Sequence, residues 1–261
     1  MQILITGASS GIGEALAIEG ARRKHDLVLV ARRKDRLDEL AEKLRSEHNI
    51  NVEVITADLT DEPQRANVIT RIQKGDIDVL INNAGFGSSG PFIELDINNE
   101  LNEIDLNVSA LVALTHAAAI PMVEKRYGTI INMSSLASYQ PMTGNAVYGG
   151  TKSFVTSFSH ALREELSESG VNIMVVCPGM TVSEFHDRSR WFDAPKRENY
   201  PSIMWQSSDD VALATFRGMD LQRGVVIPGA GNKLLAAVSS SLPGSVTRKL
   251  TAIVAKGRRL R

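Results

Sequence analysis

The sequence predicts an α/β protein: a doubly wound sheet of about seven parallel strands in a single domain. Three observations support this fold class. Short runs of β-branched and aliphatic residues recur along the chain, as expected of strands that are buried on both faces. Longer segments with apolar residues at helical spacing lie between these runs, and such alternation is typical of parallel sheets. No repeat and no domain-sized linker interrupts the alternation.

The predicted elements follow one another in a regular order. We expect strands at Ile3–Ile5, Leu27–Val30, Val52–Ile55, Val79–Ile81, Thr129–Met133, Ile173–Val176 and Val225–Ile227. We expect helices between them, among them Glu14–Arg23, Asp35–Glu47, Asn98–Glu124 and Ser153–Glu168. We interpret residues 1–240 as one domain and residues 241–261 as a basic amphipathic tail.

Composition and length exclude several classes of protein. Of the 261 residues, 43% are hydrophobic, which excludes a disordered chain, and a formal charge of −1 gives no reason to expect a nucleic-acid partner. Cys177 is the single cysteine, so no intramolecular disulfide can form, and we expect a reducing, cytoplasmic location. The chain starts with a strand-like run rather than a signal peptide, and no run of 18 apolar residues predicts a transmembrane helix.

Two segments depart from the regular pattern. Residues 184–207 contain both tryptophans, Trp191 and Trp205, together with Phe185, and we interpret them as an irregular excursion from the domain, helical in part. Residues 221–261 contain no Asp or Glu and carry a charge of +8, so the rest of the chain carries −9.

A glycine-rich turn joins the first predicted strand to the first helix. Glycines let backbone amides approach a phosphate without an intervening Cβ, and the helix start directs free N–H groups and its positive dipole end at the same place. The spacing departs from the general dinucleotide fingerprint Gly-x-Gly-x-x-Gly, and such a turn by itself also fits a structural role. The candidate phosphate contacts are Gly7, Ser9, Ser10, Gly11, Ile12 and Gly13.

Three further motifs follow later strands. They are Asn82-Asn83-Ala84-Gly85 after the fourth strand, Tyr148-Gly149-Gly150-Thr151-Lys152 at the start of a long helix, and Pro178-Gly179 after the sixth strand. In order and spacing, these motifs and the glycine-rich turn resemble the short-chain dehydrogenase/reductase family, of the compact single-domain type. The match runs from residue 3 to about residue 230. The resemblance implies a Rossmann sheet of seven parallel strands, which agrees with the strand count, and an oxidoreductase activity.

Tyr148 and Lys152 are the candidate catalytic pair. Four residues apart on a helix, they share one face, and an ammonium near a phenol stabilises the phenolate and lowers its pKa. Lys152 would thus prepare Tyr148 for proton exchange with a substrate oxygen. An isolated Tyr-x-x-x-Lys more often lies on a helix surface without function, so the assignment depends on the resemblance.

The resemblance adds two catalytic residues. It implies that Ser135, 13 positions before Tyr148, holds the substrate oxygen, with its neighbour Ser134 as the second candidate. It also implies that Asn107 anchors a water that links Lys152 to solvent, whereas an isolated buried asparagine usually satisfies backbone groups. Asn107, Ser135, Tyr148 and Lys152 are all present, which argues against a non-catalytic member of the family.

The family pattern also implies contacts with the nicotinamide half of a cofactor. Lys152 would hold the ribose hydroxyls, and Pro178 and Gly179 would line the ring. Ser183 stands where the family usually has a threonine that contacts the carboxamide, and Thr181 is a weaker candidate.

The end of the second strand predicts which nicotinamide cofactor is preferred. An acidic residue there would bind the adenosine ribose 2′-hydroxyl and repel a 2′-phosphate, but Ala31 stands at that position. Arg32 follows it, and Arg32 assisted by Arg33 could form charge-assisted bonds with a 2′-phosphate. We therefore expect a preference for NADP(H) over NAD(H), the alternative being two solvated arginines at a helix start.

The adenosine end of the site completes the set of candidate residues. The resemblance implies that Asp58 binds the adenine amino group and that Leu59 packs near the ring, although Asp58 could instead cap the helix that follows it. Asn83, Ala84 and Gly85 would support the adenosine ribose and the adjoining strand. No His, Cys or carboxylate group stands at metal-ligand spacing, so we expect no metal.

The substrate is predicted less sharply than the reaction. The family places its substrate-binding lid at residues 184–207, and the candidate pocket residues are Met142, Phe185 and Trp191. The apolar residues fit a medium-sized carbonyl or secondary-alcohol substrate. The alternatives are a 3-ketoacyl thioester on an acyl carrier protein and, from another class, an NADPH-sensing binding protein without turnover.

The sequence indicates two kinds of partner, a second copy of the chain and a surface bound by the tail. The resemblance implies a homodimer or homotetramer formed through the helices 98–124 and 153–168. The tail 241–261 has apolar residues at helical spacing with basic residues between them, a pattern that favours covering the domain or another subunit over weak peripheral contact with an anionic membrane.

Overall fold

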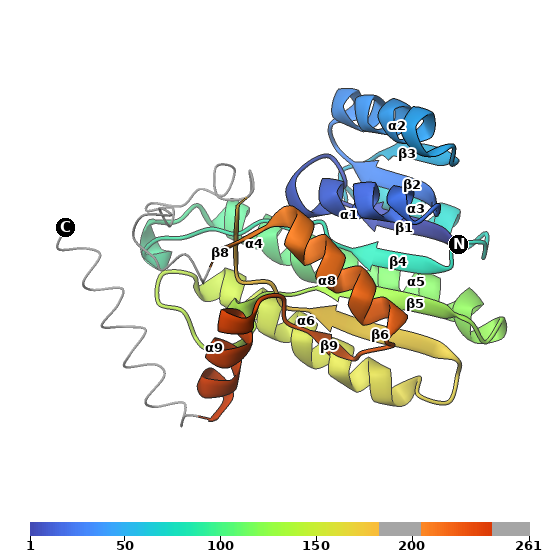
Figure 1. The fold of residues 1–261 in the computed structure, drawn as a ribbon. Coiled ribbons are helices and arrows are strands. Elements are labelled where there is room, and N and C mark those ends of the chain that lie inside the picture. Colours follow the sequence, from blue (N-terminus) through green and yellow to red (C-terminus); the bar gives the residue numbers. More distant parts are fainter. Residues whose placement is uncertain (183–204, 242–261) are drawn as a thin grey trace.

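The computed structural model describes residues 1–182 and 205–241. A seven-stranded sheet forms its centre, every neighbouring pair of strands is parallel, and the strand order is β3-β2-β1-β4-β5-β6-β9 (Figure 1). The strands are β1 Gln2–Thr6, β2 Asp26–Ala31, β3 Val52–Thr56, β4 Val79–Asn82, β5 Gly128–Met133, β6 Val171–Val176 and β9 Val225–Val226. All seven lie at the predicted places, so the expected fold class is confirmed.

Helices connect the strands and cover the sheet. They are α1 Gly11–Arg22, α2 Lys34–His48, α3 Glu62–Ile72, α4 Ile97–Ile104, α5 Leu111–Glu124, α6 Ala146–Glu165, α8 Ser208–Asp220 and α9 Ala230–Ser241. Two short 3₁₀ segments, η1 Phe92–Glu94 and η3 Leu136–Tyr139, lie in the loops before α4 and α6. The π-helical segment η2 Asp105–Ala110 joins α4 to α5.

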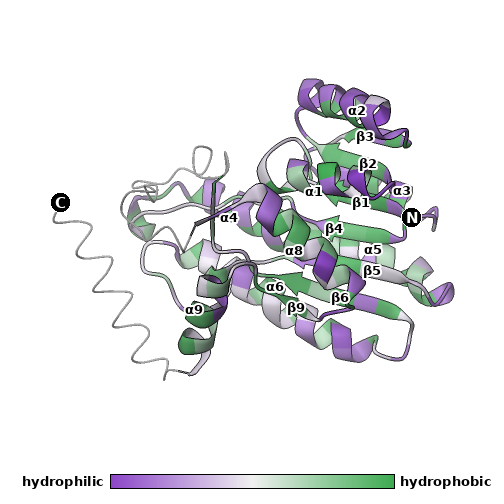
Figure 2. Ribbon diagram, viewed as in Figure 1, coloured by the Kyte–Doolittle hydropathy of each residue, from purple (hydrophilic) through white to green (hydrophobic). Residues whose placement is uncertain are grey.

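Two apolar layers hold the helices to the sheet. On one face α1, α2 and α8 contribute Leu16, Leu37 and Phe216, and on the other face α3 and α5 contribute Ile72 and Leu114. Strand residues alternate between these layers, and the central strands are hydrophobic over most of their length (Figure 2). Burial of the strands on both faces explains why they lack a polar alternation in the sequence.

Three of the differences from the sequence prediction affect the region of the site. The helix expected at Ser153–Glu168 is α6, which begins at Ala146 and therefore contains Tyr148 in its first turn. The helix expected at Asn98–Glu124 is divided by the π segment. Trp205–Ser207, the end of the segment 184–207 that was expected to be irregular, is strand β8 and pairs with β7 Met180–Val182 in a separate two-stranded sheet.

The helical run Ile97–Glu124 is long and apolar enough, by length and composition alone, to cross a membrane. It is also a core element of this domain, because Ala110, Leu114 and Ala118 are buried in the layer that covers the sheet. We attribute its apolar composition to this packing.

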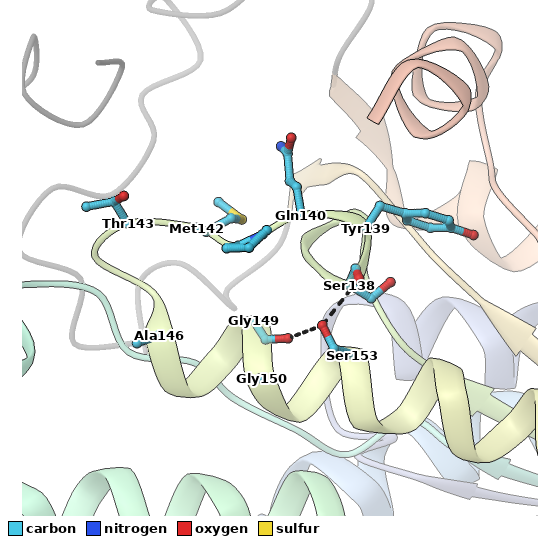
Figure 3. Close-up of a pocket in the computed structure, with 10 residues that line it drawn as sticks. Ser138, Tyr139, Gln140, Met142, Thr143, Ala146, Gly149, Gly150 and Ser153 are labelled. Atoms are coloured by element: carbon cyan, nitrogen blue, oxygen red, sulfur yellow. Dashed lines mark hydrogen bonds between the residues drawn. The ribbon is translucent and has the colours of Figure 1, made fainter. Parts of the chain in front are cut away.

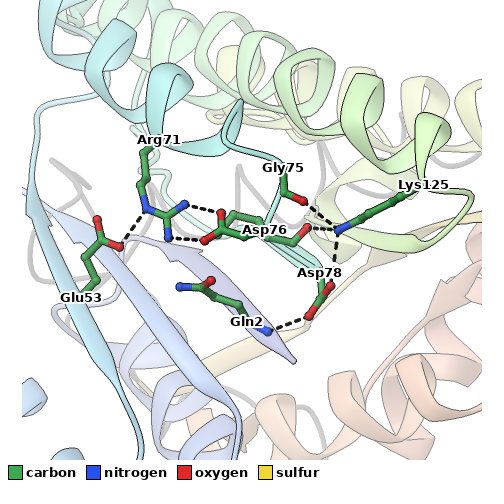
Figure 4. A network of polar contacts seen from close by, with 8 residues as sticks. Gln2, Glu53, Arg71, Gly75, Asp76, Asp78 and Lys125 are labelled. Carbon is green, nitrogen blue, oxygen red and sulfur yellow. Dashed lines mark hydrogen bonds and ion pairs between the residues drawn. The ribbon is translucent and has the colours of Figure 1, made fainter.

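The amino end of the sheet is held by a polar network (Figure 4). The guanidinium of Arg71, on α3, donates to Glu53 of β3 at 2.8 Å and to Asp76, just before β4, at 2.6 and 3.1 Å. Beside it, Asp78 accepts from the backbone N–H of Gln2 at 2.9 Å and pairs with Lys125 at 3.4 Å. The side chain of Arg71 is only 9% exposed, so its bonds tie α3 to two strands in a partly desolvated place.

This network makes a prediction about stability. Arg71→Met should lower the free energy of unfolding by about 1–3 kcal/mol at pH 7, because it leaves carboxylates without their buried partner. The Arg71 guanidinium lowers the pKa of Asp76, so the stabilisation is complete above the ordinary pKa and is lost as pH falls through the lowered one. The loss caused by the substitution should therefore shrink in acid, measured by urea unfolding between pH 3 and 7.

Arg22→Met serves as the control for that experiment. Arg22 is 61% exposed and lies 3.9 Å from Glu19, so its loss should change stability by less than about 0.5 kcal/mol. An Arg71 variant no less stable than the Arg22 variant would contradict the assignment.

Candidate active site

The site lies where the strand order reverses, between β1 and β4 at the carboxyl end of the sheet, the usual ligand position in open α/β sheets. Thr6, the buried last residue of β1, fixes this junction. Its hydroxyl accepts from the backbone N–H groups of Asn83 and Ala84, both at 2.9 Å, and the Asn83 amide donates to the Thr6 carbonyl at 2.9 Å. The Asn83 side chain therefore braces the glycine-rich turn.

The glycine-rich turn between β1 and α1 forms a cradle that side chains would fill. Gly7 and Gly11 have positive φ angles of 69° and 58°, which glycine adopts at little cost. A Cβ on Gly13 would lie 2.2 Å from the Gly7 carbonyl oxygen, so only glycine lets the helix start this close to the turn. Ser10 is the N-cap of α1, whose first turn directs backbone N–H groups toward the loop. The cradle fits a dinucleotide pyrophosphate.

The two arginines after β2 occupy different positions. The Arg33 guanidinium lies on the glycine-rich turn and donates to the Ser9 hydroxyl at 2.8 Å, the Ser9 carbonyl at 3.0 Å and the Ser10 hydroxyl at 2.7 Å. The Arg32 side chain is 71% exposed and pairs with Asp58 at 3.4 Å. Arg33 is thus bound to the turn, while Arg32 stands at its rim beside the adenosine end.

Asp58 does not cap the next helix, so that alternative is wrong. Asp61 is the N-cap of α3 and accepts from the Gln64 N–H, whereas Asp58 accepts from the backbone and hydroxyl of Thr60 at 3.0 and 2.8 Å. Burial raises the pKa of Asp58, but the Thr60 bonds and the Arg32 charge outweigh it and leave the pKa below its ordinary value. Leu59 is buried beside it.

The turn after β6 lies at the same end of the sheet. Gly179 is in close contact with Asn232 at the start of α9, since a Cβ there would lie 2.5 Å from the Asn232 amide group. The Thr181 hydroxyl, which is buried, donates to the Gly179 carbonyl at 3.1 Å. Pro178 accepts from the Leu136 N–H at 2.9 Å, which joins this turn to the segment that follows β5. Ser183 lies outside the described residues.

The catalytic candidates after β5 and on α6 meet beside these turns. Lys152 is buried, its Nζ donates to the Met133 carbonyl at 2.9 Å, and it lies 5.8 Å from the centre of the Tyr148 ring. The Ser135 hydroxyl accepts from the Ala137 N–H at 3.1 Å and also faces Tyr148. Ser134 is instead buried, and its hydroxyl donates to the Lys152 carbonyl at 2.8 Å. The structure therefore favours Ser135 over Ser134 as the substrate contact.

Asn107 lies in the π-helical segment, a feature common at functional sites. Its amide nitrogen donates to the Phe86 carbonyl at 2.8 Å and to the Thr151 hydroxyl at 3.2 Å, and its oxygen accepts from the Phe86 N–H at 3.2 Å. A Cβ on Gly85 would lie 2.8 Å from Asn107 Oδ1 and 3.5 Å from Lys152 Nζ, so the two groups flank the same glycine.

Burial shifts the pKa values of both members of the catalytic pair. Burial raises the pKa of Tyr148 to about 12, although the hydrogen bond with Ser135 lowers it in part. Desolvation of the phenolate is the largest effect on Tyr148 in this structure, and the lowering expected from Lys152 stays a prediction. Burial also lowers the pKa of Lys152 to about 8. Tyr148 is accordingly a proton donor across the neutral range.

Sequence reasoning missed two buried carboxyl groups behind the catalytic residues. Glu100 and Glu103, both on α4, are 2% and 0% exposed, and none of their side-chain oxygens has a hydrogen-bond partner among the described residues. Burial raises the pKa of Glu103 to about 7. The signal was an acidic residue one turn before Asn107 on a helix expected to be buried.

A cavity of about 520 Å³ lies between the segment after β5 and the first turns of α6 (Figure 3). Met142, one of the expected pocket residues, lines it, while Phe185 and Trp191 lie outside the described residues. None of its described lining residues is charged: Ser138, Tyr139, Gln140, Pro141, Met142, Thr143, Ala146, Gly149, Gly150 and Ser153. The described part of the chain contains no cluster of metal-ligating side chains.

Comparison with known proteins agrees with this geometry. Residues 1–192 match the family model of the short chain dehydrogenases. The NADP-dependent 3-hydroxy acid dehydrogenase of Schizosaccharomyces pombe is 36% identical over 230 residues, which is 86% of this chain and 89% of that protein. A short-chain dehydrogenase from Sphingobium yanoikuyae, solved in complex with NADPH, is 40% identical with a TM-score of 0.80 over 87% of each chain. The bulky-bulky ketone specific alcohol dehydrogenase from Comamonas testosteroni is 35% identical with a TM-score of 0.77, covering 93% of this chain and 94% of that one.

The chain belongs to the short-chain dehydrogenase/reductase family, so the resemblance seen in the sequence is confirmed. Within that family it is an oxidoreductase, and its sheet of seven parallel strands is the Rossmann arrangement that was expected.

The two arginines should have separable effects on cofactor binding. Arg32→Ala should lower the ratio of kcat/KM for NADPH to that for NADH by about tenfold or more, because a charge-assisted bond to the 2′-phosphate is lost. Arg33→Ala should weaken the binding of both cofactors, because Arg33 holds Ser9 and Ser10 of the turn in place. Nucleotide fluorescence titration and steady-state kinetics measure both effects.

Lys34→Ala is the matched control for these variants. Lys34 is an adjacent exposed cation that pairs with Asp38 on its own helix, so its loss should leave the ratio unchanged. An unchanged ratio in the Arg32 variant would show that this residue does not select the cofactor.

Proposed function

We propose that the protein transfers hydride between NADP(H) and the carbonyl or secondary-alcohol carbon of a neutral, medium-sized apolar substrate. The preference for NADP(H) is consistent with the relatives described above and with the two arginines, in the absence of an acid at the end of β2. The observation that carries the proposal is the joining of Ser135, Tyr148, Lys152 and Asn107 at the carboxyl end of the sheet, beside the glycine-rich cradle.

In the proposed reaction the chain supplies orientation and a proton. When bound, the nicotinamide provides the hydride. Ser135 holds the substrate oxygen, and Tyr148 donates its hydroxyl proton to that oxygen as the adjacent carbon is reduced. The high proton affinity of Tyr148 suits this donor role at neutral pH. Lys152 and Asn107 hold the path by which the proton of Tyr148 is replaced.

The substrate class is proposed from the residues expected to form the pocket, of which Met142 lies among the described residues. Aliphatic and aromatic surface from Met142, Pro141 and Tyr139 suits an apolar ketone. The specificity for bulky ketones stated for the Comamonas relative supports the same class.

Two alternative functions predict different experimental results. A 3-ketoacyl thioester on an acyl carrier protein would require a cationic surface near the site entrance. An NADPH-sensing protein would bind the cofactor without turnover, and the complete set of catalytic candidates makes this second alternative less favoured.

We also propose a homodimer or homotetramer in the cytoplasm. The support for assembly is a group of apolar side chains exposed on the helices α4, α5 and α6, namely Ile97, Leu101, Ile104, Ile120, Val123 and Phe154. Residues 184–204 of the lid expected at 184–207 lie outside the described residues. Residues 242–261 of the tail expected at 241–261, with its expected cover or membrane contact, lie outside them too.

Tyr148→Phe tests the proposed function. The variant should lose carbonyl reduction by about a hundredfold or more, because the proton donor is removed, and should keep its affinity for NADPH. NADPH oxidation by the purified native protein across neutral ketones, 3-ketoacyl thioesters and 3-keto acids, with the variant as blank, measures this. Turnover of thioesters alone would establish the first alternative, and NADPH binding without turnover of any substrate would establish the second.

A further inference from the structure

A strip of four residues after β4 connects the catalytic pair with the buried acids of α4. Gly85 lies against Asn107 and Lys152, and Phe86 exchanges two backbone hydrogen bonds with the Asn107 side chain. Gly87 lies against the Tyr148 ring, since a Cβ there would be 2.7 Å from Cδ2. Ser88, which is 2% exposed, comes next.

Ser88 faces Glu103 from the far side of the strip. The amide and hydroxyl of Ser88 both favour the charged form of Glu103, and the Ser88 carbonyl accepts from the Asn145 side chain at 2.8 Å, just before α6. Glu103 precedes Asn107 by four residues, and the intervening turn is the wider π turn, so both side chains lie near one face of the helix. Glu103 and Lys152 thus lie on opposite sides of one narrow strip.

Both charged groups lack a direct ionic partner. Among the described residues no carboxylate lies within ion-pairing distance of Lys152, whose Nζ bonds to a carbonyl, and no cation lies within ion-pairing distance of Glu103. An isolated buried charge is costly, so the two opposite charges stabilise each other across the strip. The charge of Glu103 acts on Lys152 and also on Tyr148.

We propose that Glu103 is a positioning residue whose carboxylate keeps the Tyr148–Lys152 pair protonated to higher pH and thereby extends, toward alkaline pH, the range over which the protein reduces a carbonyl. The inference rests on the proposed function and deepens it. Tyr148 must carry its proton to donate it, and a protonated Lys152 is needed to replace that proton.

The negative charge of Glu103 shifts the pKa of Tyr148 and that of Lys152 in the same direction. A nearby negative charge favours the ammonium over the amine and the phenol over the phenolate, so it raises the pKa of Lys152 and of Tyr148 together. Glu103 is itself ionised above about pH 7, where this effect is needed. The groups that face Glu103 are Glu100 on its own helix, Ser88 on the strip, and Tyr148 and Lys152 on α6.

Glu100→Gln provides a matched control. Glu100 has the same chemistry, is almost equally buried and also has unpartnered oxygens, one turn earlier on α4. Its charge acts on Glu103 but is not among the causes that shift the pKa of Lys152 or Tyr148. Glu103→Asp keeps the charge and should restore most of the native behaviour.

The first measurement uses the full chain without cofactor and needs no activity. Lysine labelled with ¹³C at Cε reports the protonation of Lys152, whose signal is assigned by its loss in Lys152→Met. The titration midpoint should fall by about half a unit to one unit in Glu103→Gln and stay near the native value in Glu100→Gln and Glu103→Asp. An unchanged midpoint in Glu103→Gln overturns the proposal, whether or not a substrate has been found.

The second measurement uses the substrate that the panel identifies. The alkaline limit of kcat/KM for reduction should move to lower pH by a similar amount in Glu103→Gln, and the rate below neutral pH should change little. A uniform loss of rate at every pH, with an unmoved alkaline limit, would show that Glu103 is merely structural. Failure of the panel itself would refute the proposed function and leave the lysine titration to decide on Glu103.

Discussion

The Thr6 hydroxyl at the end of β1 is the interaction on which the rest of the site depends. It binds two consecutive backbone N–H groups after β4, and so fixes the glycine-rich turn against the start of the strip 85–88. Gly7 approaches Ala84 so closely that a Cβ would lie 2.9 Å from its Cα. Every catalytic candidate then contacts this strip or lies on α6 beside it. The same backbone segment therefore positions both the cofactor cradle and the proton-transfer groups.

The sequence was sufficient to predict those features of the fold and the site that depend on local chemistry. Strands buried on both faces left continuous apolar runs, and the turn after β1 needed glycine at two positive φ angles, so both were visible as residue types. The order of Asn107, Ser135, Tyr148 and Lys152 was visible for the same reason. What could not be seen depends on contacts between distant residues, such as Arg33 on the glycine-rich turn and the β7–β8 pairing.

Electrostatics was the least predictable part of the site. Spacing on a helix brings Lys152 near Tyr148, but it does not reveal that both groups are desolvated or that Lys152 donates to the Met133 carbonyl. Burial then dominates the pKa of Tyr148 and raises it. The preference for Ser135 over Ser134, which the resemblance implied, gains support from the structure because the Ser134 hydroxyl donates to the Lys152 carbonyl.

The π-helical turn at Asp105–Ala110 affects how the sequences of related proteins align with this one. Such a turn holds one residue more than an ordinary helical turn, so a single-codon deletion there would convert it to regular α-helix without breaking the chain. Because the wider turn absorbs its extra residue, the deletion would leave α4 and α5 in nearly the same relative orientation and would alter the backbone mainly around Asn107. In an alignment of relatives, a one-residue gap at this position therefore marks chains in which this geometry has been lost.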